Sequence, residues 1–299
     1  MPKTRSRRIV VFGDVVDDVV IIPNQPMRSD SDTASMIRFR PGGSAANTAA
    51  WLGSIHAEVD FVGRVAALDH ERHVRFLRDS GVHPILVKDR ELPTGTVVMI
   101  VDGYRRTMLT DRGANTNLRT EAVTDALLNR ARYLHLTGYS LLEESNSAEF
   151  PALIARAKAA GVDVSVNPAS AALLLEYGKD RFLEAIAGAA ILMLTEEDAR
   201  VLTGLDDAQS MALALGQLFP IVAVMLGPNG ALVAKGNDPV VRFPAIAVEV
   251  ADTTGAEDAF CAGFLHSLLA DELDAAAATK AGVALGGRAV GLIGGRPPA

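Results

Sequence analysis

The chain has 299 residues, 49% hydrophobic and 22% charged, which excludes a disordered polypeptide and allows a large buried core. The formal net charge of −7 argues against a nucleic-acid-binding surface, which needs clustered basic residues. Cys261 is the only cysteine, which excludes an internal disulfide, and no apolar run approaches the roughly 18 residues of a membrane-spanning helix. We expect a cytoplasmic protein that binds neither nucleic acid nor a membrane, with a solvated basic tail at residues 3–8.

Short β-branched segments alternate with alanine- and leucine-rich segments along most of the chain, a pattern typical of parallel βαβ units. Buried strands are predicted over residues 9–12, 133–136, 162–166, 191–194 and 221–226. Helices are predicted over residues 45–52, 148–160 and 207–218. The expected fold is α/β, with a central and mostly parallel sheet that carries helices on both faces.

Two early stretches, residues 19–40 and 94–110, do not follow this alternation. The second has strand-like segments at 97–102 and 106–110 on either side of Gly103, as in a hairpin. We expect the two stretches to pair as a small β-sheet lid inserted into the α/β core. The predicted core comprises residues 1–17, 41–93 and 113–299, and the predicted lid comprises 18–40 and 94–112. The polar edge of the lid suggests a homodimer formed through its strands.

The strongest chemical signal is the segment from Val250 to Phe260. A strand is predicted over 245–250, followed by a turn of small residues and a helix from near Ala256. A helix N-terminus presents unpaired N–H groups that bind anions, and Asp258 in its first turn is placed to take a proton from an attacking hydroxyl group. The alternative is that Glu257 and Asp258 only complement the helix dipole.

Two further motifs precede predicted helices or follow predicted strands. Gly42 and Gly43 allow a close approach of the backbone to a ligand, with the amide of Asn47 directed to the same region, although such glycine pairs are more often simple turns. Asp14, Asp17 and Asp18 follow the first strand, at the edge where α/β proteins bind ligands, or they are solvated loop acids.

Together these motifs resemble those of the PfkB, or ribokinase-like, carbohydrate kinases. The resemblance runs through essentially the whole chain, because the motifs occur in the order of that family. The first signature matches Gly42, Gly43, Asn47, Leu52, Gly53 and residues 61–63, and the second matches residues 252–260. Between them the order continues through residues 102–103, 106–107, 113–115, 136–139, 191–192, 196–197, 226–227 and Gly230.

The resemblance implies a ribokinase-like fold and an ATP-dependent transfer of phosphate to a sugar or sugar-like hydroxyl. It implies that Asp258 is the general base and that the amides of Gly255, Ala256, Glu257 and Asp258 form the anion hole. The substrate-binding residues that it implies are Asp18, Gly42, Gly43, Asn47 and Arg106. It places the nucleotide near Thr195, Gly227 and Gly230, Mg²⁺ near Asp198, and K⁺ at carbonyls near Asp252 and Thr254.

The chain also departs from the family pattern around the phosphates. Glu257 stands where the family has the second anion-hole glycine, and one like-charge pair at 4 Å costs about 4 kcal/mol at an effective dielectric constant of 20. Thr195 replaces a usual asparagine, and Met225 replaces a frequent threonine. Three readings stay open: a sugar kinase with normal or reduced activity, a nucleoside kinase, or a sugar- or nucleotide-binding protein whose catalysis is impaired.

Overall fold

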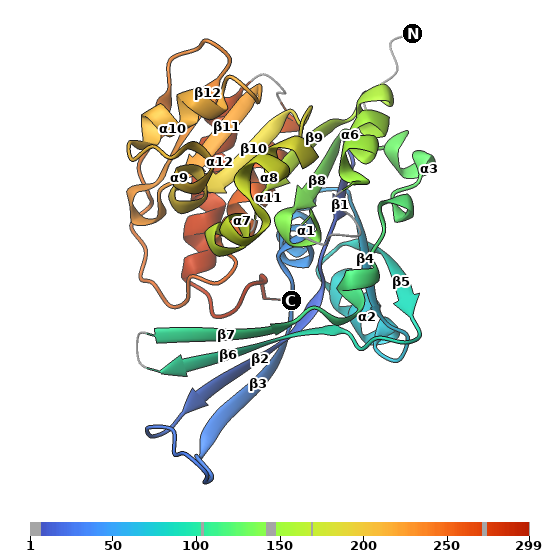
Figure 1. Cartoon of the computed structure of the whole chain (residues 1–299), viewed down its shortest axis with the longest axis vertical. Helices are drawn as coiled ribbons and strands as arrows, with labels where there is room; N and C mark the ends of the chain where they lie inside the picture. The colour runs from blue at the N-terminus through green and yellow to red at the C-terminus, as the bar shows by residue number, and fades with distance from the viewer. Residues whose placement is uncertain (1–6, 103–104, 142–147, 169, 271–273, 299) are drawn as a thin grey trace.

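The computed structural model describes residues 7–102, 105–141, 148–168, 170–270 and 274–298, apart from the side chains of residues 102, 105 and 106. A nine-stranded sheet forms the centre of the molecule, in the order β13-β12-β11-β10-β9-β8-β1-β4-β5 (Figure 1). Its strands run in the same direction except β12, which pairs antiparallel with both β11 and β13. The strands are β1 (Ile9–Phe12), β4 (Val59–Ala66), β5 (His83–Asp89), β8 (Tyr133–Thr137), β9 (Asp163–Asn167), β10 (Ile191–Thr195), β11 (Ile221–Met225), β12 (Ala231–Lys235) and β13 (Val241–Phe243).

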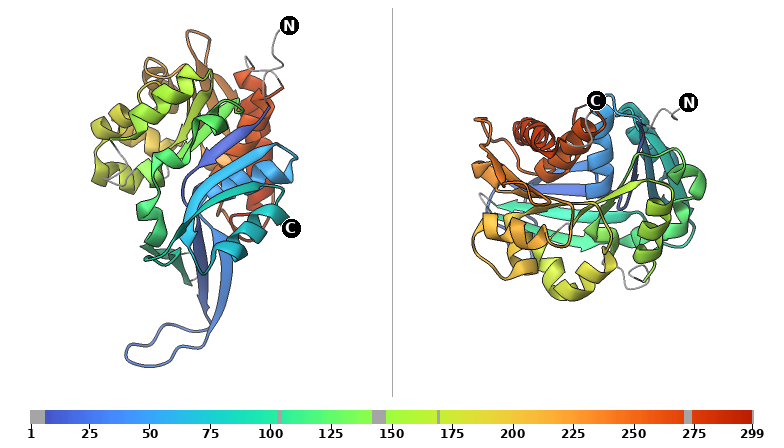
Figure 2. Two further views of the ribbon diagram at one scale, coloured as in Figure 1. Left: turned by 90° about the vertical axis from the view of Figure 1, so that its right-hand side faces the viewer. Right: turned by 90° about the horizontal axis from the view of Figure 1, so that it is seen from above.

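Side chains alternate across this sheet and so feed two separate hydrophobic cores. In β1, Val10 and Phe12 enter one core, while Ile9 and Val11 enter the other. Helices cover both faces (Figure 2). One face carries α1 (Ser44–Ser54), α2 (His70–Asp79), α11 (Ala256–Leu268) and α12 (Ala275–Val290). The other carries α3 (Asp125–Leu128), α4 (Gly138–Leu141), α6 (Phe150–Ala159), α7 (Ala171–Tyr177), α8 (Lys179–Ala185), α9 (Glu196–Thr203) and α10 (Ala208–Leu215).

A second sheet of four strands projects from one end of the large sheet (Figure 1). Its order is β3-β2-β6-β7, with β2 (Val16–Pro23), β3 (Ser35–Gly42), β6 (Gly95–Asp102) and β7 (Arg105–Asp111). The turn predicted at Gly103 lies outside the described residues. Because β2 starts four residues after β1 ends, the small sheet begins at the carboxyl edge of the large sheet. It therefore stands next to the edge where parallel α/β sheets bind ligands.

The mostly parallel α/β fold with a second small sheet is confirmed, but the strand predicted over residues 245–250 is wrong. That segment has no regular secondary structure, and β13 ends at Phe243, directly before Pro244. Proline lacks the N–H group that would continue the ladder. The β-branched side chains of Ile246, Val248 and Val250 line a cavity instead. Among the described helices, none is long and apolar enough to cross a membrane.

Candidate active site

Asp258 lies where two helices meet, in the first turn of α11 and against the start of α1. Both of its carboxylate oxygens accept hydrogen bonds from α1. The Ser44 hydroxyl donates to Oδ1 at 2.7 Å, and the Asn47 amide donates through Nδ2 to Oδ2 at 3.1 Å. Asp258 is 9% exposed and Asn47 is 5% exposed. The carboxylate is thus held in one orientation while keeping an accessible edge.

The N-terminus of α1 is fixed by a second carboxylate, Asp14, from the loop after β1. Asp14 accepts hydrogen bonds from the main-chain N–H groups of Ser44 at 2.8 Å and Ala45 at 3.1 Å, and from the Thr137 hydroxyl at 3.0 Å. Gly43 precedes the helix with φ of 96°, and a Cβ there would lie 2.6 Å from the Asp14 carbonyl oxygen. A side chain at position 43 would therefore disturb the contact that positions Ser44.

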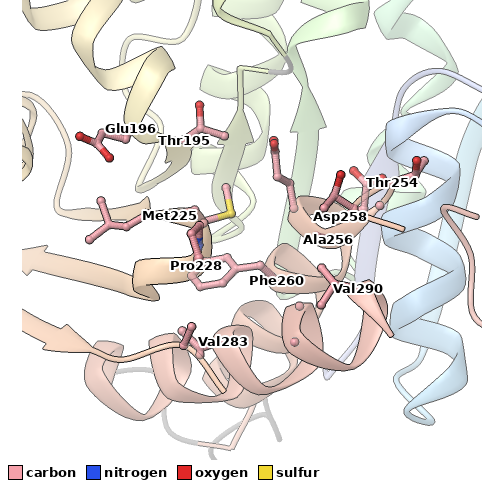
Figure 3. A pocket seen from close by; sticks show the side chains of 18 of the residues that line it. Thr195, Glu196, Met225, Pro228, Thr254, Ala256, Asp258, Phe260, Val283 and Val290 are labelled. Atoms are coloured by element: carbon pink, nitrogen blue, oxygen red, sulfur yellow. The ribbon is translucent and has the colours of Figure 1, made fainter. Parts of the chain in front are cut away.

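Two neighbouring cavities share Asp258 as part of their walls. The small cavity has a volume of about 180 Å³, and its lining includes Asp14, Asp18, Asn47, Met99, Met108 and Asp258. The large cavity has a volume of about 1120 Å³, and its lining includes Thr195, Gly227, Ile246, Glu257, Asp258 and Val283. Figure 3 shows Thr195 and Met225 across this large cavity from Asp258 and Thr254. A group bound in one cavity can therefore reach a group bound in the other at Asp258.

Burial raises the pKa of four carboxyl groups around these cavities, those of Asp18, Asp198, Glu257 and Asp258. The pKa of Asp258 rises to about 7, because burial outweighs the hydrogen bonds from Ser44 and Asn47. The pKa of Asp18 rises to about 6, again mainly through burial, and the charge of Arg296 opposes the rise. Burial raises the pKa of Glu257 to about 8, and the neighbouring charges of Asp198 and Asp258 add to it. An Asp258 pKa near neutrality suits a general base.

The turn before α11 lines both cavities. Gly255 has φ of 76°, in the left-handed region, and a Cβ there would collide with the carbonyl oxygen of Gly295. No side chain caps this helix N-terminus among the described residues. The Ala256 N–H group donates to the Thr253 carbonyl at 3.3 Å, so the N–H groups of Glu257 and Asp258 are the candidates for an anion site.

The nucleotide-side residues of the sequence hypothesis also gather around the large cavity. Thr195 and Asp198 form a capping box at the start of α9: the Thr195 hydroxyl accepts from the Asp198 N–H group, and Asp198 Oδ2 accepts from the Thr195 N–H group. Met225 is the strand neighbour of Thr195, and Gly227 and Gly230 also line this cavity. Thr195 therefore has a structural task in addition to its place in the cavity wall.

The residues present fit the cations that the family resemblance implies. Asp198 is a buried carboxyl group in the lining of the large cavity. This suits Mg²⁺, which is usually held by one or two carboxylates together with water and phosphate oxygens. Asp252 accepts from the N–H groups of Thr254 at 3.0 Å and Gly294 at 3.0 Å, so it orders the two loops near which the resemblance places K⁺.

The structure brings most of the predicted site residues together and adds others. Asp18, Gly43 and Asn47 line the small cavity, and Gly42 packs against the Asp18 carboxylate. The side chain of Arg106 lies outside the described residues. Sequence reasoning missed Ser44 and Arg296. Ser44 follows the glycine pair directly, which was an available signal, whereas nothing in the sequence links Arg296 to Asn47, 249 residues away.

Known proteins resemble this chain along nearly its whole length. A family model described as pfkB family carbohydrate kinase matches residues 6–299. A fructokinase from Vibrio alginolyticus is 32% identical over 279 residues, covering 87% of this chain and 84% of the relative. An ATP-dependent ribose-1-phosphate kinase from Halopiger xanaduensis is 30% identical over 273 residues, covering 88% and 86%.

Solved structures agree in fold. A probable sugar kinase from Rhizobium etli superposes with a TM-score of 0.87 at 24% identity, covering 99% of this chain and 96% of the other. A fructokinase double mutant from Vibrio cholerae, solved with fructose, ADP and a potassium ion, superposes with a TM-score of 0.80 at 25% identity, covering 98% and 95%.

Proposed function

Because the chain belongs to the PfkB family of carbohydrate kinases, we propose that it transfers the γ-phosphoryl group of ATP to a hydroxyl group of a sugar or sugar-like substrate. One observation carries this proposal: Asp258 lines both cavities, and its two carboxylate oxygens are held by Ser44 and Asn47. A sugar in the small cavity and ATP in the large cavity would meet at this carboxylate.

In this mechanism Asp258 accepts the proton of the substrate hydroxyl as that oxygen bonds to the γ-phosphorus, and ADP leaves. Asp18, Gly43 and Asn47 would bind and orient the substrate in the small cavity. The N–H groups at the start of α11 would stabilise the charge on the transferred phosphoryl group, which is the main requirement of phosphoryl transfer. Mg²⁺ held near Asp198 would neutralise phosphate charge. K⁺ near Asp252 and Thr254 would stabilise the loop before α11.

The small sheet would act as the lid of this site. It contributes Val97, Met99 and Met108 to the wall of the small cavity, so it shields bound substrate from water. We propose that the lid comprises residues 18–40 and 94–112 and the core the remaining ranges given above. Its edge strand β3 exposes Ile37 and Phe39, and we also propose dimerisation through this sheet.

A second candidate is a sugar- or nucleotide-binding protein with impaired catalysis, and Glu257 favours it. This carboxyl group lines the large cavity beside Asp258, where the phosphates of ATP would lie. When ionised it would repel them, and its raised pKa of about 8 limits this effect at neutral pH. A nucleoside acceptor is a further form of the kinase proposal, because the same base and anion site would serve it.

The test is ATP turnover over a panel of sugars and nucleosides, measured as ADP release. We compare the natural protein with Asp258→Asn, with Glu257→Gly, and with the control Asp206→Asn, whose carboxylate is 99% exposed. We expect Asp258→Asn to lower kcat by about 10²–10⁴-fold and Asp206→Asn to leave it unchanged. Turnover by Asp258→Asn within threefold of the natural protein would contradict the proposal. Turnover found only in Glu257→Gly would favour the binding protein.

A further inference from the structure

Residues 291–296, here called the closing segment, pack across the base of the site. The Trp51 indole N–H in α1 donates to the Gly295 carbonyl at 2.9 Å, and the Gly294 N–H donates to Asp252 Oδ2 at 3.0 Å. Gly295 also lies against Gly255 at the start of α11. The closing segment is therefore fixed to both helices that carry the site.

Arg296 extends from this segment to the side chain that holds the proposed base. Its Nε donates to Asn47 Oδ1 at 3.1 Å, and its Nη2 donates to the Gly42 carbonyl at 2.8 Å. An amide oxygen only accepts and an amide nitrogen only donates. The bond to Arg296 therefore turns the Asn47 nitrogen toward Asp258, to which it donates at 3.1 Å.

The charge of Arg296 acts on the same two acids that face the substrate. Burial lowers the pKa of Arg296 to about 10, so its guanidinium stays charged at neutral pH, and Asp18 and Asp258 support that charge. In return Arg296 lowers the pKa of both carboxyl groups against the effect of burial. Arg296 itself is not among the residues that line either cavity.

We propose that Arg296 is a positioning residue for phosphoryl transfer: it fixes the orientation of the Asn47 amide and thereby holds the Asp258 carboxylate toward the substrate hydroxyl. The inference rests on the proposed function. A purely structural role, in which Arg296 only tethers the closing segment, is the alternative that the experiment must separate.

The first measurement is the pH profile of kcat/KM for Arg296→Met. Two controls match it: Arg288→Met removes an exposed arginine of α12, and Trp51→Phe removes another tether of the closing segment. We expect Arg296→Met to lower kcat/KM about 10–100-fold at neutral pH and to move the acid limb to higher pH. Arg288→Met should change neither. Trp51→Phe should lower the melting temperature but leave the acid limb in place.

The conservative variant separates charge from orientation. Lysine keeps the positive charge but cannot reproduce the paired bonds to Asn47 and Gly42. We expect Arg296→Lys to restore part of the acid-limb position while kcat stays at least about tenfold low. Full recovery of both by lysine would contradict a role in orienting Asn47.

A second readout does not depend on turnover. The titration of the Asp258 carboxyl is followed by ¹³C NMR of aspartate-labelled protein and assigned with Asp258→Asn. We expect Arg296→Met and Asn47→Leu each to raise its midpoint, and the double variant to raise it by less than their sum. If neither the midpoint nor the acid limb moves in Arg296→Met, the inference is overturned. If the midpoint moves but the natural protein turns over no substrate, the proposed function alone has failed.

Discussion

On the small-cavity side of Asp258, side chains from separate parts of the chain bind one another, whereas the large-cavity side encloses a much larger space. The first side joins Asp14, Ser44, Asn47 and Asp258 through hydrogen bonds of 2.7–3.1 Å. The second side encloses about 1120 Å³, against about 180 Å³ for the small cavity. In the proposed mechanism, the groups around Asp258 that must be aligned within a fraction of an ångström are ordered before the substrate binds. ATP in the large cavity would bring its own charge and cations.

The carboxyl groups follow the same division. Asp258 on the ordered side is bonded through both oxygens, so its ionised form is supported despite burial. Glu257 lines the large cavity, and there both burial and the neighbouring negative charges raise its pKa. If ATP binds as proposed, Glu257 is compatible with the neighbouring phosphates only while it keeps its proton.

The largest effect on stability should come from Gly255, which lines both cavities. We expect Gly255→Ala to lower the free energy of unfolding by about 2–5 kcal/mol, because it adds left-handed strain and a collision with Gly295. Gly204→Ala is the matched control, since Gly204 has φ of 71° but nothing within 4 Å of a Cβ. Urea unfolding should show a loss of about 1–2 kcal/mol for the control. Equal losses in both variants would mean that the contact with Gly295 is unimportant.

An intermediate effect should come from the proton on Glu257. As pH rises through about 8, Glu257 ionises, so we expect KM for ATP to rise roughly threefold to tenfold between pH 6 and pH 9 at constant free Mg²⁺. Glu257→Gln should remove the rise, and the exposed Glu176→Gln should retain it. A pH-independent KM in the natural protein would contradict a titrating carboxyl group beside the phosphates.

The same carboxyl group affects stability with a definite sign. Its pKa in the folded protein, about 8, exceeds its ordinary value of 4.5, so the folded state retains a proton that the unfolded state releases. The stability that Glu257 supports is therefore present below about pH 4.5 and is lost as the pH rises through about 8. Urea unfolding should show Glu257→Gln gaining stability relative to the natural protein between pH 5 and pH 9.

The smallest effect should distinguish a helix N-cap residue in the candidate site, Thr195, from one outside it, Asp207. Thr195→Ala and Asp207→Ala each remove the N-cap of a helix, α9 and α10 respectively, and each should cost about 0.5–2 kcal/mol of unfolding free energy. Only Thr195→Ala should also raise KM for ATP, by about twofold to tenfold, because it frees Asp198 at the large cavity. If both variants keep the natural KM, the capping box has no part in nucleotide binding.

Sequence reasoning succeeded where an apolar run was continuous and missed a strand where polar residues or glycine interrupted the run. The uninterrupted apolar runs of β1, β10 and β11 were predicted closely. Strand β4 was missed, because Asp60, Gly63 and Arg64 break its pattern although it pairs on both sides. Residues 245–250 carry a strand-like pattern whose apolar side chains serve a cavity instead.

For the site, the motifs indicated the local pieces but not their long-range partners. Asp258 and Asn47 each lie in the first turn of a helix that follows a recognisable glycine turn, and the fold brings the two helix starts together. Arg296 follows two glycines in a segment with no motif of its own. Its contact with Asn47 depends on how the fold brings the closing segment to α1, which no local sequence pattern encodes.

The separation along the chain of the groups that meet at Asp258 also bears on how the protein folds. Ser44 and Asp258 are 214 residues apart, and Asn47 and Arg296 are 249 apart. Contacts between residues so far apart in the sequence form late in folding. Closing such a long loop costs conformational entropy, and this cost is offset only after the intervening chain has become organised. A partly folded chain can contain most of its helices and strands before this cluster exists. During refolding, recovery of substrate binding should therefore lag behind recovery of far-ultraviolet circular dichroism, which makes the site a strict reporter of complete folding.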